Sequence, residues 1–391
     1  MHTHSINNLL GLKDVIVRKI SQTEHLIQVF IETHPKPHTC PVCGQVTSKV
    51  HDYRTQVIKD LPALRKQLVL VLRKRRYVCK CGKKFYESYS FLPKYHRMTN
   101  RLSAHICEEM RKCIPVSMIA KDSGVSTHTV SRVFSFVKYP NVLRMPKVLC
   151  IDEFKGNTDA GKYQCILVDG ESHQILDVLP NRNKSNLIRY FLSIPRYERL
   201  KVKFFVSDMC GYFSQVAQDM FPNATLIVDK YHFVRQVTWA VENVRKRIQQ
   251  TMLPYLRKYF KRSKSLILKP KSQLKDHEKE ALDVMLTYSD DLRQAYNLKE
   301  NFYELCGESS FEKQKVMFGN WILYAQNTRL QEFNACITAF CNWSKEILNS
   351  FKYNYSNGPT EGTNNKIKVL KRVCYGFRNF DRLRNRILHL E

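Results

Sequence analysis

Four of the thirteen cysteines form two closely spaced pairs, a pattern typical of metal binding. Cys40 and Cys43 are separated by two residues, and Cys79 and Cys81 by one. Each pair can direct both sulfurs at one ion, and two pairs complete the tetrahedral four-thiolate site of structural zinc. Unpaired thiols are the alternative, and three nearby histidines could replace one ligand: His34, His38 and His51. Pairing at both positions favours Zn²⁺ bound by the four cysteines.

Several acidic residues follow apolar, strand-like runs in the second part of the chain. Asp152 follows Val148–Ile151, and Asp208 follows the run that begins at Val202. Carboxylates at neighbouring strand ends can share Mg²⁺ (or Mn²⁺), which prefers oxygen ligands. Two such ions about 4 Å apart promote phosphodiester chemistry. Asp169 and Asp177 fit the same pattern, so pattern alone does not select the pair.

Glu361 begins a third candidate segment. Gly358-Pro359 interrupts the chain, and Thr360 is positioned to cap a helix that runs to about Arg372. Helical spacing places Glu361 near an amide, Asn364 or Asn365, and near basic residues further along the same face. Such a face can hold a metal ion and a phosphate backbone. A carboxylate that merely stabilises a helix N-terminus explains the spacing equally well.

A mixed sheet would bring these acids together. The sequence predicts three antiparallel strands within 147–180, then a helix over 184–193 and a strand over 202–208. A helix over 212–220, a strand over 224–229 and a long helix from about Tyr231 complete the series. In such a sheet the first and fourth strands can lie side by side and parallel. Asp152 and Asp208 would then meet at the C-terminal strand ends, where open α/β sheets place their sites.

Residues 101–137 show helical periodicity with a break typical of a helix-turn-helix. One helix ends at Pro115, a short helix follows, and Gly124 marks a turn before a second helix that starts near Ser126. Small polar residues at the start of that helix suit docking in the major groove. The outward-facing residues predicted there are Ser126, Thr127, His128, Ser131 and Arg132. An ordinary helical hairpin is the alternative.

Composition narrows the class of protein. The 391 residues carry a net charge of +29, of which +17 lies in residues 1–150, and such a charge indicates a polyanionic partner, most often nucleic acid. The basic run Arg73–Arg76 is a candidate for phosphate contact. No apolar run reaches the ~18–20 residues of a membrane span. The N-terminus also lacks the features of a secretory signal. We therefore expect a cytoplasmic protein without a membrane partner. The nine other cysteines suit buried positions.

The order of the motifs resembles the ISL-three family of bacterial insertion-sequence transposases. The cysteine pairs and the helix-turn-helix are followed by Ile-Asp-Glu-Phe, Val-Ser-Asp-Met and Val-Asp-Lys-Tyr-His-Phe. The segment Ser356–Lys368, Ser-Asn-Gly-x-x-Glu-Gly-x-Asn-Asn-x-Ile-Lys, completes the series. The resemblance covers essentially the whole chain.

This resemblance implies an α/β, RNase H-like mixed-sheet catalytic domain with a helical insertion and a DDE triad. Carried over by motif, the triad is Asp152, Asp208 and Glu361. Asp229, in a motif that also contains His232, remains a rival for the second acid. The triad would hold Mg²⁺ or Mn²⁺, cleave DNA at the ends of the element and join the 3′-hydroxyls to target DNA.

The implied partners are double-stranded DNA, as terminal inverted repeats and as target, and a second copy of the chain on DNA. Its place in the cell would be the cytoplasmic, nucleoid-associated one of a bacterial transposase. The expected organisation is a zinc-binding module over 1–97, a helix-turn-helix domain over 98–145 and a catalytic domain over 146–391, with its helical insertion at about 240–350.

Two other functions remain open at this stage. A non-enzymatic DNA-binding regulator would explain residues 1–145 but would give the strand-end acids no task. A nuclease of similar fold would cut DNA without joining it.

Overall fold

The structure is a computed structural model that describes residues 11–12, 14–262 and 264–390. It divides into two compact units, which we describe separately. One comprises the described residues up to Pro140 together with those from Lys368 onward, and the other is Asn141–Ile367. Residues 1–10, on which the expectation about a secretory signal rests, lie outside the described residues. None of the helices in the described ranges combines the length and the apolar character needed to cross a membrane.

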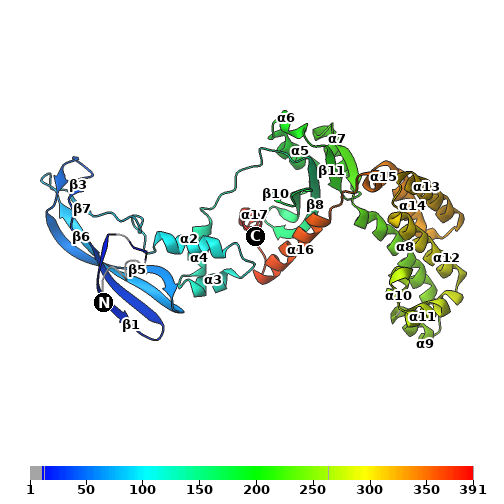
Figure 1. Cartoon of the computed structure of the whole chain (residues 1–391), viewed down its shortest axis with the longest axis horizontal. Helices are drawn as coiled ribbons and strands as arrows, with labels where there is room; N and C mark the ends of the chain where they lie inside the picture. Colours follow the sequence, from blue (N-terminus) through cyan, green and yellow to red (C-terminus); the bar gives the residue numbers. More distant parts are fainter. Residues whose placement is uncertain (1–10, 13, 263, 391) are drawn as a thin grey trace. The chain divides into compact units, whose positions relative to one another are not determined.

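The first unit begins with a twisted sheet built on two long strands (Figure 1). The strands are β1 (Val15–Gln22), β2 (Leu26–Thr33), β5 (Val50–Ala63), β6 (Lys66–Val78) and β7 (Lys84–Tyr86). Their order is β1-β2-β6-β5, with β7 paired to β6. All neighbours are antiparallel except β2 and β6. A two-stranded sheet, β3 (His38–Thr39) and β4 (Val46–Thr47), lies between the cysteine pairs in sequence.

Three short helices follow and form the predicted helix-turn-helix. They are α2 (Asn100–Glu109), α3 (Val116–Asp122) and α4 (Thr127–Phe134). Ser126 caps α4 by accepting the N–H of Thr129, and Gly124 forms the turn at φ +64°. Ile119 and Val130 are buried between the helices, whereas His128 and Arg132 are exposed. The outward face of α4 therefore carries the residues predicted from the sequence.

The helix-turn-helix is tied to the hairpin end of β5 and β6. The side-chain amide of Gln67, on β6, donates to the carbonyl of Asp122, and the Lys59 ammonium, on β5, donates to that of Gly124. The C-terminal helix α17 (Phe380–Leu388) also packs in this unit. Its fully buried Arg386 donates to backbone carbonyls just beyond α2, including Lys112 at 2.8 Å. These bonds hold the sheet, the helix-turn-helix and α17 together.

The second unit contains the predicted mixed sheet (Figure 1). Its strands are β8 (Val148–Thr158), β9 (Gly161–Asp169), β10 (Ile175–Leu179), β11 (Phe204–Ser207) and β12 (Thr225–Val228). The order is β10-β9-β8-β11-β12, antiparallel from β10 to β8 and parallel from β8 to β12. The first and fourth strands are therefore parallel neighbours, as predicted, and the order is that of an RNase H-like fold. The connecting helices are α5 (Lys184–Leu192), α6 (Arg196–Arg199) and α7 (Gly211–Met220).

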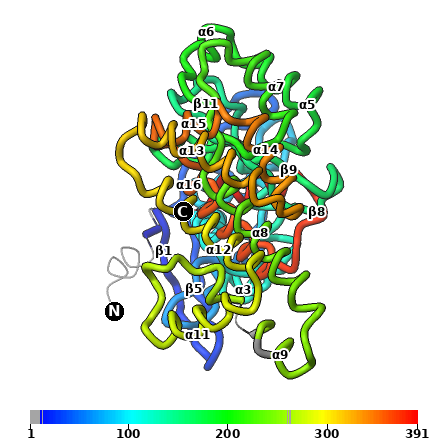
Figure 2. Tube along the Cα trace, turned by 90° about the vertical axis from the view of Figure 1, so that its right-hand side faces the viewer, coloured from blue at the N-terminus to red at the C-terminus, as the bar shows by residue number. Residues whose placement is uncertain are grey.

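A helical body follows β12 and matches the predicted insertion. It begins with α8 (Lys230–Gln250), which packs against α12 (Asp290–Gly307), as Figures 1 and 2 show. Phe233 and Phe302 meet edge to face in its core. The other helices are α9 (Pro254–Arg262), α10 (Lys264–Leu268), α11 (Asp276–Thr287), α13 (Phe311–Asn327), α14 (Asn334–Asn342) and α15 (Ser344–Tyr353). Two 3₁₀ turns, η1 (Lys271–Gln273) and η2 (Gln331–Phe333), lie between them.

Three local expectations need correction. Strand β8 continues six residues past Asp152, because its second half pairs with β9 in a hairpin. Helix α16 (Gly358–Val373) begins before Thr360, so Thr360 lies in the first turn and is not its cap. Pro359 lacks the N–H that would be unpaired in a first turn, so the helix accepts it there. Of the nine cysteines expected to be buried, Cys113 and Cys341 are exposed.

The predicted domain limits 1–97, 98–145 and 146–391 remain sequence-based, because compactness groups the chain differently. The buried Arg386 joins the last helix to the first unit, although that helix follows the catalytic segment in sequence. Helix α16 starts in the second unit and ends in the first.

Candidate active site and zinc centre

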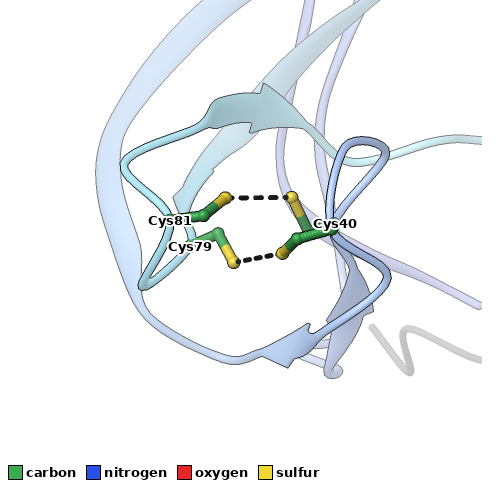
Figure 3. A group of neighbouring side chains, drawn as sticks. Cys40, Cys79 and Cys81 are labelled. Atoms are coloured by element: carbon green, nitrogen blue, oxygen red, sulfur yellow. Dashed lines mark hydrogen bonds between the residues drawn. The ribbon is translucent and has the colours of Figure 1, made fainter.

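The two cysteine pairs converge at the end of the long strands where β5 begins and β6 ends (Figure 3). The sulfurs of Cys40, Cys43, Cys79 and Cys81 all lie within 4.8 Å of one another. The Sγ–Sγ distances are 3.7 Å for Cys40 and Cys81 and 3.4 Å for Cys43 and Cys79. Four thiolates around Zn²⁺ at about 2.3 Å would stand about 3.8 Å apart, so the sulfurs need little movement to bind it.

Without a metal ion, the surroundings favour a thiolate at Cys40 and a thiol at Cys43. The pKa of Cys40 is lowered to about 6, first because the backbone N–H of Cys43 donates to its sulfur. The backbone N–H of Gln45 lowers the pKa of Cys43, but contacts with Cys79 and Cys81 outweigh it and raise that pKa to about 12.

Two of the three histidines weighed as substitutes have other partners, since His38 packs on Tyr77 and His51 pairs with Asp52. None of the three, His34 included, belongs to the group of four sulfurs. The described residues contain no other comparably tight group of potential ligands. The four cysteines suffice for a structural zinc site.

Three acids lie at one level across the parallel half of the second sheet. Val206 on β11 pairs with Cys150 on β8, so Asp208 comes level with Asp152 two residues later. Ser207 pairs with Val228 on β12, so Asp229 comes level with Asp208. Neighbouring parallel strands are about 4.8 Å apart, which makes Asp208 the middle member of a row. The pattern-based rivals lie elsewhere: Asp169 pairs with Leu149 near the start of β8, and Asp177 accepts a hydrogen bond from Tyr190 on α5.

Burial disfavours the charged forms of this row. It raises the pKa of Asp152 to about 6, and it also raises the pKa values of Asp208 and Asp229. Asp208 and Asp229 add to the shift of Asp152, Asp229 adds to that of Asp208, and Glu361 adds to that of Asp229, whereas His232 opposes all three shifts. The row therefore concentrates negative charge that the protein alone does not neutralise. A divalent cation would supply the missing positive charge.

Helix α16 docks on this row through two asparagines. The backbone N–H of Asn357 donates to Asp229 Oδ1 at 2.8 Å, and its side-chain amide donates to the Ile151 carbonyl at 3.1 Å. The side-chain amide of Asn364, further along α16, donates to Asp152 Oδ2 at 2.8 Å. Glu361 lies between them on the first turn, is exposed, and helps to raise the pKa of Asp229. The third predicted acid thus comes within electrostatic range of the row.

The donor atoms around the row suit a hard cation. Asp208 Oδ1, Asn357 Oδ1 and Asn364 Oδ1 are buried and have no hydrogen-bond partner among the described residues. Buried oxygens usually have a partner, so these unpaired acceptors beside carboxylates are available to coordinate a cation or a water molecule. Mg²⁺ and Mn²⁺ take such oxygen ligands. The residues present therefore fit the divalent metal that the resemblance implied.

Sequence reasoning missed the partners that orient the row. It proposed Asn364 or Asn365 as a neighbour of Glu361 and did not pair either with Asp152. It also missed Glu153, which is held by Arg182 at 2.5 Å and by the hydroxyl of Tyr212 at 3.1 Å. These contacts join residues far apart in sequence, so no local spacing predicts them.

Comparison with known proteins agrees with this architecture. Residues 149–387 match a family model for ISL3 described as "Transposase", and residues 36–81 match the "zinc-finger of transposase IS204/IS1001/IS1096/IS1165". Residues 87–137 match the "Helix-turn-helix domain of transposase family ISL3". Fold and site together define a DDE-class protein with zinc-binding and helix-turn-helix modules. The chain belongs to the ISL3 family of insertion-sequence transposases.

Individual relatives show how far the similarity extends. The transposase of insertion sequence element IS1001 from Bordetella parapertussis is 25% identical over 365 residues, which is 90% of this chain and 88% of the relative. The IS1557 transposase of Mycobacterium tuberculosis is 22% identical over 241 residues, 56% of this chain and 54% of the relative. A Lactococcus lactis protein named "ATP-dependent protease" is 32% identical over 111 residues, 28% of this chain and 34% of that protein.

Proposed function

We propose that this transposase binds the terminal inverted repeats of its insertion sequence, cleaves DNA there and joins the freed 3′-hydroxyls to target DNA. The observation that carries the proposal is the row of acids at one sheet level, with Asn364 of α16 and Asn357, the residue just before α16, hydrogen-bonded to the two ends of the row. The exposed face of α4 supports recognition of the DNA ends, because such a face reads base edges in the major groove.

Asp152, Asp208 and Glu361 are the residues that would hold the metal. Asp152 is fixed in orientation, since Glu153 N–H donates to its Oδ1 and Asn364 to its Oδ2. Asp208 Oδ1 is buried and has no hydrogen-bond partner among the described residues, whereas Asp229 Oδ1 accepts the backbone N–H of Asn357. This contrast supports Asp208 as the second acid and Asp229 as a residue that positions α16. When bound, Mg²⁺ or Mn²⁺ supplies polarisation of the phosphate and a more acidic water.

The reaction has two balanced steps. In the first, a water oxygen attacks phosphorus at the element end, the bond to the 3′-oxygen breaks, and a 3′-hydroxyl and a 5′-phosphate form. In the second, the 3′-hydroxyl attacks a target phosphodiester and one new P–O bond replaces one old one. The number of phosphodiester bonds is conserved in joining, so the step needs no external energy source. The buried row keeps its carboxylates in place through both steps.

A gel assay with labelled end-containing duplex, target DNA and Mg²⁺ tests the proposal. The variants Asp152→Asn, Asp208→Asn and Glu361→Gln keep side-chain shape and should lose both cleavage and joining. Asp219→Asn, at an exposed position on α7, is the matched control and should keep both activities. Cleavage without joining by the unmodified protein would indicate a nuclease, and full activity of Asp152→Asn would refute the assignment of the site.

We further propose that two or more copies act together on DNA, because the reaction must hold two element ends at once. Light scattering of the protein with paired end duplexes should show a complex with at least two chains. A single chain per pair of cleaved and joined ends would contradict this assembly. Its substrate places the site of action at the bacterial nucleoid.

A further inference from the structure

A basic groove of about 1120 Å³ lies in the first unit, away from the helix-turn-helix. Its floor is formed by β5 and β6 near Arg54, Gln56 and Lys74. Its walls are the segment around β7 and the loop 92–97. The groove therefore lies between the zinc end of the two long strands and the hairpin end that holds the helix-turn-helix.

The charge of this groove is almost entirely positive. Six cations line it: Arg54, Lys74, Lys83, Lys84, Lys94 and Arg97. Within the described ranges none of these six cations forms an ion pair with a carboxylate; Glu87 and Asp52 pair instead with Arg75 and Arg76. All six except Lys74 are exposed. Cations that converge without a carboxylate to pair with them mark an anion site.

The one acid in the groove lining does not cancel this charge. Glu87 is buried, and its carboxylate accepts the backbone N–H of Arg75 and the hydroxyls of Thr33 and Tyr89, each within 2.8 Å. Its Oε2 also faces the buried guanidinium of Arg75. The charge of Glu87 is thus used inside the module, and the groove presents cations to solvent.

Two tyrosine rings are held at the rim of the groove. Tyr86 is 42% exposed, with Lys74 at 4.9 Å from its ring centroid. Tyr95 is 89% exposed and has φ +66°, a region that non-glycine residues rarely adopt. Its loop is fixed on both sides, since Gln56 donates to the His96 carbonyl at 2.7 Å and Lys59 N–H to the Arg97 carbonyl at 2.9 Å. The loop therefore displays an aromatic ring instead of burying it.

We propose that this groove binds the sugar–phosphate backbone of DNA, with Tyr86 and Tyr95 packing on sugars or unpaired bases. Cations along a groove with interleaved aromatic rings match a DNA strand, because phosphates recur along it and each nucleotide has a flat face. The inference rests on the proposed binding of DNA ends and adds a second, sequence-independent contact to that of α4.

The position of the groove suits the DNA that α4 reads. Lys59, which holds the turn before α4, and Arg54, in the groove, are five residues apart on β5. Strands rise about 3.4 Å per residue, so these positions are about 17 Å apart. One turn of B-DNA spans about 34 Å, so a single duplex is long enough to reach both contacts. The groove would thus grip the backbone within one turn of the bases read by α4.

The test is the salt dependence of DNA binding by the full-length protein. The double variant Lys84→Gln/Lys94→Gln removes two groove cations, and Lys19→Gln/Arg65→Gln removes two exposed cations outside the groove. With end duplex, the plot of log affinity against log salt should become shallower in the groove variant, its negative slope shrinking in magnitude by about two, while the control variant leaves it unchanged. Preference for end sequence over random sequence should stay the same in both.

Binding measurements with single-stranded DNA, made in parallel, identify which form of DNA the groove holds. If the rings stack on bases, Tyr95→Ala should weaken single-strand binding by about tenfold and duplex binding less. Loss confined to duplex would assign the groove to a paired backbone. Equal salt slopes for the groove and control variants on both DNA forms would overturn the inference. Failure to prefer or cleave end DNA would instead refute the proposed function and leave the groove result intact.

Discussion

Replacement of Asp229 by asparagine distinguishes a positioning residue from a metal ligand. Asp229 Oδ1 accepts the backbone N–H of Asn357 at 2.8 Å, and this bond fixes the start of the helix that carries Glu361. The asparagine side chain keeps an oxygen that can accept the same bond. Its amide group would face His232, whose Nε2 lies 4.0 Å from Oδ2. Asp229→Asn therefore removes the charge and retains the attachment of α16.

The expected magnitude follows from the bond that is weakened. A hydrogen bond to a charged group contributes roughly 1.5–3 kcal/mol and a neutral one roughly 0.5–1.5, so the change costs about 1 kcal/mol. That is about a fivefold loss of cleavage rate if rate follows the population of docked α16. Asp229→Ala leaves a buried N–H unpaired and costs about 1–3 kcal/mol, up to about a hundredfold. Loss of a ligand to the catalytic ion costs several kcal/mol of transition-state stabilisation.

The assay is cleavage of end duplex at saturating Mg²⁺ by Asp229→Asn, Asp229→Ala and Asp208→Asn, with thermal unfolding measured in parallel. We expect cleavage to fall in that order, with Asp208→Asn inactive. Because burial raises the pKa of Asp229, removal of its buried charge should offset the weakened hydrogen bond, so the metal-free unfolding temperature should change little. An inactive Asp229→Asn beside an active Asp208→Asn would show that Asp229 is the second metal ligand and would refute this assignment.

Three further predictions concern other parts of the molecule. Cys79→Ser should abolish zinc binding and destabilise the β module by several kcal/mol, because zinc binding supplies ~10–16 kcal/mol in small zinc fingers. The control Cys341→Ser, at an exposed position, should do neither. Metal analysis and thermal unfolding of both variants check this prediction. At subsaturating Mg²⁺, cleavage should fall below about pH 6, because a proton on Asp152 then competes with the metal. Metal-free protein should gain stability as pH falls from about 6 towards 4, because the folded state then binds a proton that the unfolded chain does not. Chemical denaturation measured across that range checks this, and a stability that does not change with pH would contradict it. Arg132→Ala should reduce discrimination between end and random DNA by about 1–3 kcal/mol, measured by competition binding, and unchanged discrimination would exclude a base contact.

Much of the second unit follows from local patterns. Alternation of apolar runs and turns predicts strands β8 to β12 in order, and the connection rules then make β8 and β11 parallel neighbours. The register of β8 and β11 then brings Asp152 level with Asp208, because both acids end apolar runs of matching phase. Each cysteine pair is equally local in sequence, whereas the pairing of β5, β6 and β7 brings all four sulfurs within 4.8 Å of one another.

The features that escaped prediction depend on tertiary contacts. The run Arg73–Arg76 reads as one phosphate-binding patch, but strand alternation divides it: Arg75 points inward and is 4% exposed, Arg76 pairs with Asp52, and only Lys74 lines the groove. The docking of Asn357 on Asp229 joins residues 128 positions apart. Buried Arg386 serves carbonyls more than 270 positions away. No period or spacing in a single sequence encodes such pairs.

Metal-directed cleavage of the polypeptide itself locates the catalytic ion in the protein. Fe²⁺ in place of Mg²⁺, with ascorbate and peroxide, generates hydroxyl radicals at the bound ion and cuts the backbone nearby. We expect cuts close to Asp152, Asp208 and Glu361, which Asp152→Asn should abolish and excess Mg²⁺ should suppress. Cuts confined to other segments, or an unchanged pattern in Asp152→Asn, would show that the catalytic metal does not bind at this row of acids.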